Sequence, residues 1–244
     1  MTANRSRTQL ACGFVLHQRP FRDTSLIVDL FVRDHGRLSV FARGVRGPRS
    51  RFAALQPFRP LLLSWSGRGE SPALSGAEDD GPPPASMPAS RILSGFYLNE
   101  LLLRLTVPHD PNPELYALYA ETLGQLRGGE PLETALRLFE KRMLDLLGYG
   151  NDLLHDAAGR AVEPKGLYHF RPGAGLRVAE RADAAGAVEG RVLLALAAEA
   201  PVGDAEGQRQ ARQVLRAALD HCLDGRELRV RTVARAVARM ERPC

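Results

Sequence analysis

The chain has 244 residues, of which 44% are hydrophobic and 25% charged, and its formal net charge at pH 7 is +5. This length and composition allow a sizeable core and suggest two domains. No window approaches the roughly twenty apolar residues that cross a bilayer, and the N-terminus lacks the apolar run of a secretory signal. We therefore expect a cytoplasmic protein with no membrane contact.

Three cysteines, Cys12, Cys222 and Cys244, lie far apart and form no C-x-x-C pair. An odd number at such spacing argues against a disulfide framework and against a zinc knuckle. We expect reduced thiols, no metal and no other cofactor.

Residues 1–78 have the short apolar runs of a small β-domain. In one run Leu26, Val28 and Leu30 alternate with the other side chains, a period of two that is typical of a strand with one face in a core. The tripeptide at 34–36 predicts a hairpin turn. The predicted strands are Leu10–Gln18, Ser25–Val32, Arg37–Val45, Phe58–Ser66 and a weaker Ser71–Ala77. Such a series suggests a small closed five-stranded β-barrel such as an OB-fold, and periodicity alone leaves an SH3-like barrel open.

Residues 79–90 contain four prolines, a glycine and small residues, so we predict a linker. In residues 91–244 the apolar period becomes that of helices, and Gly148 is the predicted C-terminal cap of the third. The predicted helices are Arg91–Val107, Pro113–Leu126, Pro131–Leu147, Gly190–Ala198, Ala205–Leu223 and Leu228–Arg239. A glycine-rich excursion at about 149–187, with one apolar cluster at 167–170, predicts irregular structure with a short hairpin. The fold class is therefore α+β.

Positive charge is concentrated near the N-terminus. Residues 1–60 hold eleven arginines against three acids, a net charge of +8, so residues 61–244 carry −3. Six arginines lie from Arg33 to Arg51, on a strand and the glycine-containing loop after it, against the single acid Asp34. Arginines at this spacing can turn together toward a polyanion, and nucleic acid is the commonest one in a cell. A solvated arginine-rich loop is the alternative.

Catalytic motifs are incomplete in this chain. Gly69–Ala73 lacks the second glycine of a nucleophile elbow, and Gly44–Gly47 is too short for a phosphate loop and follows a strand. His109 and Asp110 resemble a metal phosphohydrolase pair, but the prolines on either side predict a turn between helices. We expect a protein that is not an enzyme.

Aromatic residues make up only 6% of the chain, which shifts the expected nucleic-acid contacts toward phosphates. Four phenylalanines fall at strand positions where core packing is the default: Phe14, Phe31, Phe41 and Phe58. Trp65 is a candidate for stacking on a base, although a lone tryptophan on a small barrel is more often core or rim. The arginine-rich segment 226–242 is either a second nucleic-acid contact or a solvated helix face.

Several short fragments, in a fixed order and spacing, carry a family resemblance. They are Gly13–His17, Asp23–Leu26, His35–Leu38, Ala42–Gly44, Leu55–Phe58, Gly67–Glu70, Phe96–Leu101, Ala135–Glu140 and Leu147–Gly150. Together they resemble the RecO family of bacterial DNA repair proteins. The resemblance fades after about residue 165 and so covers most of the chain.

The resemblance implies an N-terminal OB-fold on a helical domain, in a DNA repair and recombination mediator of the RecF pathway. Such proteins bind single- and double-stranded DNA, anneal complementary strands without nucleotide hydrolysis, and help replace single-strand-binding protein (SSB) by RecA. The implied partners are DNA, the acidic C-terminal tail of SSB, RecR and, indirectly, RecA, at the nucleoid. The alternative function is a non-catalytic adaptor whose helical domain docks acidic protein tails, with DNA binding secondary.

Site residues follow from the matching positions. The implied DNA-binding face consists of Arg37, Arg43, Arg46, Arg49 and Arg51. Arg137, on the third helix, is implied to meet the SSB tail beside an apolar groove, and a salt bridge within the helical domain is the alternative for it. Some members hold zinc with four cysteines after the position of Gly148; residues 149–187 contain none here, so no metal is expected.

Overall fold

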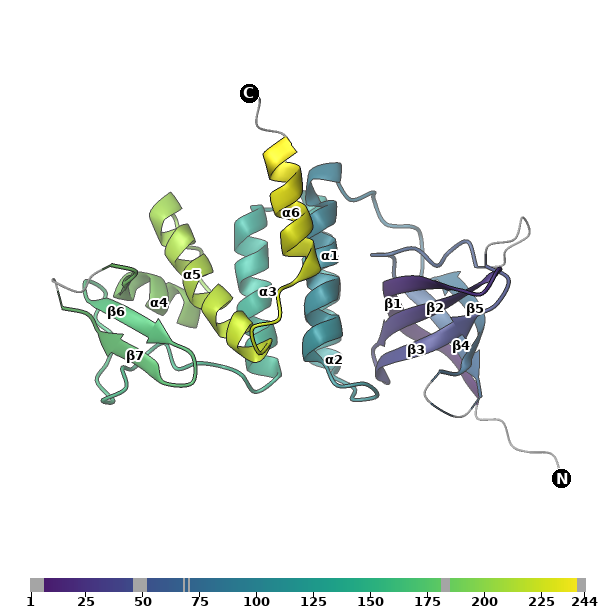
Figure 1. The fold of residues 1–244 in the computed structure, drawn as a ribbon, viewed down its shortest axis with the longest axis horizontal. Coiled ribbons are helices and arrows are strands. Elements are labelled where there is room, and N and C mark those ends of the chain that lie inside the picture. Colours follow the sequence, from purple (N-terminus) through teal and green to yellow (C-terminus); the bar gives the residue numbers. More distant parts are fainter. Residues whose placement is uncertain (1–6, 46–51, 68, 70, 181–184, 241–244) are drawn as a thin grey trace. The chain divides into compact units, whose positions relative to one another are not determined.

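A computed structural model describes residues 7–45, 52–67, 69, 71–180 and 185–240 (Figure 1). Contacts divide the chain into two compact units, one of residues 1–127 with 228–244 and one of residues 128–227. The first unit holds the barrel and three helices, and the second holds the remaining helices and a small sheet. The boundary between the units therefore does not coincide with the connection at 80–88, which has no helix or strand.

The first unit begins with five strands. They are β1 (Arg7–Phe21), β2 (Ser25–Val32), β3 (Gly36–Ala42), β4 (Leu61–Ser66) and β5 (Ala73–Asp79). These strands close into a barrel in the order β1-β2-β3-β5-β4, with β4 paired to β1 and a parallel pairing of Phe41 with Ala73 between β3 and β5. This strand order is that of an OB-fold, which confirms the predicted barrel and excludes the SH3-like alternative.

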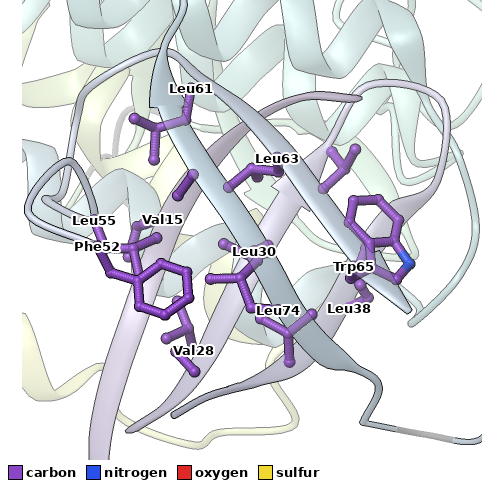
Figure 2. Packing of buried hydrophobic residues seen from close by; sticks show 14 residues of the cluster. Val15, Val28, Leu30, Leu38, Phe52, Leu55, Leu61, Leu63, Trp65 and Leu74 are labelled. Atoms are coloured by element: carbon purple, nitrogen blue, oxygen red, sulfur yellow. The ribbon is translucent and has the colours of Figure 1, made fainter. Parts of the chain in front are cut away.

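Alternating side chains build the barrel core. In β3, Leu38, Val40 and Ala42 are buried, whereas the residues between them are partly exposed on the outer face. Figure 2 shows apolar side chains from all five strands converging on the barrel interior, together with Phe52 from the segment after β3. Trp65 belongs to this core with 7% of its surface exposed, so it is not available to stack on a base.

Three helices complete the first unit: α1 (Ala89–Leu105), α2 (Pro113–Gly128) and α6 (Arg229–Met240). The predicted turn at 108–111 joins α1 to α2, and in it the amide of His109 donates to the carbonyl of Arg37 at 2.8 Å. The carboxylate of Glu100 accepts the amides of Arg229 and Val230, each at 2.9 Å. A buried acid of α1 therefore satisfies the free amides at the start of α6 and holds it on α1.

The second unit contains three helices and three short strands. They are α3 (Leu132–Leu146), β6 (Leu167–Arg171), β7 (Gly175–Val178), β8 (Val188–Glu189), α4 (Gly190–Ala197) and α5 (Ala205–Cys222). As predicted, Gly148 caps α3: its amide donates to Asp145, and the amide of Tyr149 donates to Leu144 at 2.8 Å. The predicted hairpin is the β6–β7 pair, to which β8 adds a third strand.

Candidate nucleic-acid interface

Helices α1 and α2 cover one end of the outer face that β1, β2 and β3 form. Phe14 of β1 and Phe31 of β2 point outward there and pack on two tyrosines of α2. The ring centroid of Phe14 is 5.1 Å from that of Tyr119, and the centroid of Phe31 is 5.8 Å from that of Tyr116. This covered half joins the barrel to the helices, so a candidate binding surface has to lie at the other end of the same strands.

A bulge in β1 decides which side chains reach that open end. Val15 is opposite Leu30, and His17 is opposite Asp29, so Leu16 is an extra residue in β1. One extra residue reverses the side to which every later side chain of a strand points. Because of the bulge, His17, Arg19 and Phe21 lie on the outer side of the barrel and not in its core.

We call the other end of this outer face the open half. It carries Arg19, Phe21 and Arg22 at the end of β1 and Phe41 and Arg43 at the end of β3, so that arginines lie beside aromatic rings. Arg19 of β1 is opposite Ile27 of β2, and Ile27 is opposite Phe41 of β3. The rings of Phe21 and Phe41 have centroids 5.2 Å apart, and the Arg22 guanidinium lies 5.3 Å from the centroid of Phe21. The core position predicted for Phe41 is therefore wrong, because its alternation with Val40 and Ala42 places it outside.

The charge of the open half is mainly positive. Arg19, Arg22 and Arg43 are exposed, and within the described part of the chain none of them forms an ion pair. The acid on this face is Asp29, which accepts the hydroxyl of Ser39 at 2.5 Å and lies 3.4 Å from Nδ1 of His17; Asp23, in the β1–β2 turn, is exposed.

The predicted DNA-binding arginines are not all at one place. Arg43 follows β3 directly and belongs to the open half. Three others, Arg46, Arg49 and Arg51, lie outside the described residues.

Arg37 is instead on the covered half. Its Nε donates to Oγ1 of Thr106 at 3.2 Å and its Nη2 donates to the carbonyl of Thr106 at 2.9 Å, while burial lowers its pKa. Thr106 caps the C-terminus of α1, where a positive charge is favourable. Arg37 therefore joins β3 to α1, and its guanidinium is occupied.

Arg19 and Arg22 were absent from the predicted site. The segment at 19–22 shows two arginines between two predicted strands, but their direction depends on the bulge at Leu16, which no local pattern marks. A count of outward positions that assumed regular alternation would have placed Arg19 with the covered or core side chains.

A second candidate site lies in the second unit, where Arg137 of α3 borders an open hollow. The apolar lining of the hollow comes from Leu138, Leu196, Val202 and Ala211, and the charged side chains of Lys141 and Glu199 also line it. Nη2 of Arg137 forms a salt bridge of 2.9 Å with Oε1 of Glu140, whose side chain is only 1% exposed. The salt bridge predicted as an alternative is therefore present.

The guanidinium of Arg137 keeps capacity for a ligand. Its Nε is buried and has no hydrogen-bond partner in the described chain, and the group also lines the hollow. Lys141, four residues further along α3, is paired with Asp145 at 2.7 Å and with Glu199 at 3.5 Å. The hollow thus has apolar walls, two cationic side chains and the acid Glu199. The apolar walls and the free Nε of Arg137 suit an acidic segment with apolar side chains.

Two kinds of feature are absent from the described residues. Among them, no three His, Cys, Asp or Glu side chains are grouped so as to hold a metal ion. The helices formed by the same residues are too short or too polar to span a bilayer.

Comparisons with known proteins identify both parts of the chain. Residues 8–79 match the family model of the recombination protein O N-terminal domain, and residues 89–232 match that of its C-terminal domain. The chain is 45% identical over 233 residues to a DNA repair protein RecO of Methylococcus capsulatus, covering 95% of each chain. It is 46% identical over 234 residues to a DNA repair protein RecO of Alkalilimnicola ehrlichii, covering 94% of this chain and 92% of that one.

Proposed function

The chain belongs to the RecO family of DNA repair proteins, and on that premise we propose that it is a recombination mediator that binds single- and double-stranded DNA and anneals complementary strands. The observation that supports DNA binding most directly is the open half of the OB-fold outer face. It presents Arg19, Arg22 and Arg43 without ion pairs to the described acids, on the face of an OB-fold that is used for oligonucleotides. Arg46, Arg49 and Arg51 follow Arg43 in the chain and lie outside the described residues; we propose them as further DNA contacts.

Annealing needs no bond to be broken. Guanidinium groups that contact phosphates release the counterions condensed on each strand and lower the repulsion between two strands, so that base pairing proceeds. No catalytic group is required for this step. We therefore propose that the protein acts without hydrolysis of a nucleotide.

Binding of labelled DNA over a range of salt concentrations tests this surface. Replacing Arg19, Arg22 and Arg43 together by Ala should weaken binding and make the log–log slope less steep, by about 0.7 for each lost phosphate contact on single strands. Arg212→Ala is the matched control, because Arg212 is an exposed arginine of α5 in the other unit. An unchanged slope in the triple variant would refute the proposed surface.

The hollow beside Arg137 is the proposed docking site for the acidic tail of SSB. The apolar walls would take the apolar side chains of the tail, and Arg137 and Lys141 would face its carboxylates. Arg137→Ala should abolish binding of a fluorescent peptide with the sequence of the tail, while leaving DNA binding unchanged. Arg212→Ala serves as the control, because Arg212 is an exposed arginine of α5 in the same unit and does not line the hollow.

Strand annealing on SSB-coated DNA without ATP tests the complete function. The mediator proposal expects annealing by the wild type, loss with the triple arginine variant and loss with Arg137→Ala. RecR, added to the reaction with RecA, should promote exchange of SSB for RecA. The alternative adaptor function expects peptide binding to persist and annealing to be insensitive to the arginines of the barrel.

A further inference from the structure

The open half carries two phenylalanines that the barrel core does not use. Phe21 is the last residue of β1, Phe41 lies one residue before the end of β3, and both side chains are half-buried. Their planes are tilted by 54°, and the Arg22 guanidinium lies against Phe21. Part of the aromatic surface therefore remains exposed to solvent among exposed arginines.

The backbone under Phe41 is fixed from both sides. Its amide donates to the carbonyl of Pro72 at 2.9 Å, it pairs with Ala73 where the barrel closes, and on its other side it is opposite Ile27. An aromatic side chain has only two rotatable χ angles, so little conformational freedom is lost when it binds. The two rings are thus a preorganised surface and not a flexible loop contact.

Arginines lie close to both rings along the chain. Arg19 precedes Phe21 by two residues in β1, which span about 6.6 Å, and Arg43 follows Phe41 by two residues, just after the end of β3. A base that rests on one of the rings would leave its phosphate within reach of a long arginine side chain. Proteins that bind single strands combine these two elements, a cationic groove and aromatic side chains on which bases stack.

We propose that Phe21 and Phe41 form a stacking platform for the unpaired bases of single-stranded DNA. The inference rests on the proposed DNA-binding function and names the part of that site which distinguishes a single strand from a duplex, since duplex bases are already stacked on each other. A stacking platform departs from the expectation, drawn from the low aromatic content of the chain, that contacts to phosphates dominate DNA binding. The competing role for the two rings is a cross-strand aromatic pair that only stabilises the sheet.

Paired oligonucleotides separate these roles. The affinity of each variant is measured for an oligothymidylate, for an abasic strand with the same number of phosphates, and for a duplex. Phe41→Leu keeps an apolar side chain beside Phe21 but removes the aromatic face, and Phe41→Trp keeps an aromatic face. Phe96→Leu is the matched control, because Phe96 is an exposed phenylalanine of α1 that packs on Phe58 and lies on another element.

We expect Phe41→Leu to bind oligothymidylate about tenfold more weakly, as loss of one stacked base implies, with the salt slope unchanged. Its affinity for the abasic strand and for the duplex should equal that of the wild type. Phe41→Trp should restore the preference for oligothymidylate, and Phe96→Leu should behave as the wild type on all three ligands.

Three results would overturn the platform. The wild type binding oligothymidylate and the abasic strand equally well would show that only phosphates are contacted. A loss in Phe41→Leu of the same size on all three ligands would assign the ring to sheet stability, as would equal affinities of Phe41→Leu and Phe41→Trp for oligothymidylate. Failure of the wild type to bind any of the ligands would instead refute the proposed DNA-binding function itself, which keeps the two failures distinct.

Discussion

Asn99 of helix α1 donates from Nδ2 to the carbonyl of Leu16, the extra residue of the β1 bulge, at 2.8 Å. The same amide lies 3.4 Å from the carbonyl of Val15, and the hydroxyl of Tyr119 donates to Oδ1 of Asn99 at 2.6 Å. A bulge leaves backbone groups without a partner in the strand ladder, and burial makes such groups costly. The Asn99 side chain therefore supplies a hydrogen bond to the backbone of the bulge, and the bulge directs Arg19 and Phe21 toward the open half.

Asn99→Leu should destabilise the protein by about 2–3 kcal/mol, because the carbonyl of Leu16 and the Tyr119 hydroxyl would both lose a buried partner. Urea unfolding measures the change. Asn112→Ala provides the comparison: Asn112 caps α2 by accepting the amide of Leu115 at 2.9 Å, and its loss should cost about 1 kcal/mol. Equal effects of the two substitutions would show that the bulge does not depend on Asn99.

The sequence predicts where the helices and strands lie. It does not predict which side chains the barrel turns toward its open half. Alternation in β3 and the helical period after residue 89 mark the structure correctly, because each depends on neighbours along the chain. The bulge at Leu16 depends on Asn99, which is 83 residues away, and no local pattern encodes it. For this reason Arg19 and Arg22 were missed.

Arg37 is the opposite case, a residue that was predicted to contact DNA and is covered by a helix. Its position in an alternating strand predicts correctly that it points outward, and its charge suggested a DNA contact. The strand pattern does not reveal that α1 ends against this part of the barrel, where the carbonyl of Thr106 accepts a hydrogen bond from Arg37. A residue that alternation assigns to the surface is thereby covered by another element.

The turn between β2 and β3 leaves no room for a side chain at Gly36. This residue has φ +68°, and a Cβ atom built on it would lie 2.2 Å from the carbonyl oxygen of Asp110. Gly36→Ala should therefore cost more than the roughly 1 kcal/mol of an unfavourable backbone angle alone. Gly44→Ala is the matched control, because Gly44 has φ +70° with no atom within 4 Å of that position. Thermal unfolding of both variants measures the difference, and equal losses would contradict the close approach of Asp110.

Stability should fall in acid through Asp204, the N-terminal cap of α5. The Arg191 guanidinium at 2.5 Å and the amide of Gly207 at 2.7 Å hold the pKa of this carboxylate at about 2, below its ordinary value of 3.8. A carboxylate with a lowered folded-state pKa stabilises the protein fully above pH 3.8, and this contribution disappears as the pH falls to about 2. Asp204→Asn should reduce the loss of stability in that window, as followed by urea unfolding at several pH values. A variant with the pH dependence of the wild type would assign the acid sensitivity to other groups.

Arg37 and Arg43 carry the same charge at the two ends of β3 and should respond oppositely to substitution. Arg37→Met removes both hydrogen bonds to Thr106 and should cost about 1–3 kcal/mol of stability, with the salt dependence of DNA binding unchanged. Arg43→Ala removes an exposed side chain without an ion pair to a described acid, so stability should stay within about 0.5 kcal/mol while the salt slope becomes less steep. Urea unfolding and salt titration of both variants give the four values. If Arg37→Met lowered the slope as much as Arg43→Ala did, Arg37 would contact DNA after all, and its bond to Thr106 would have to open on binding.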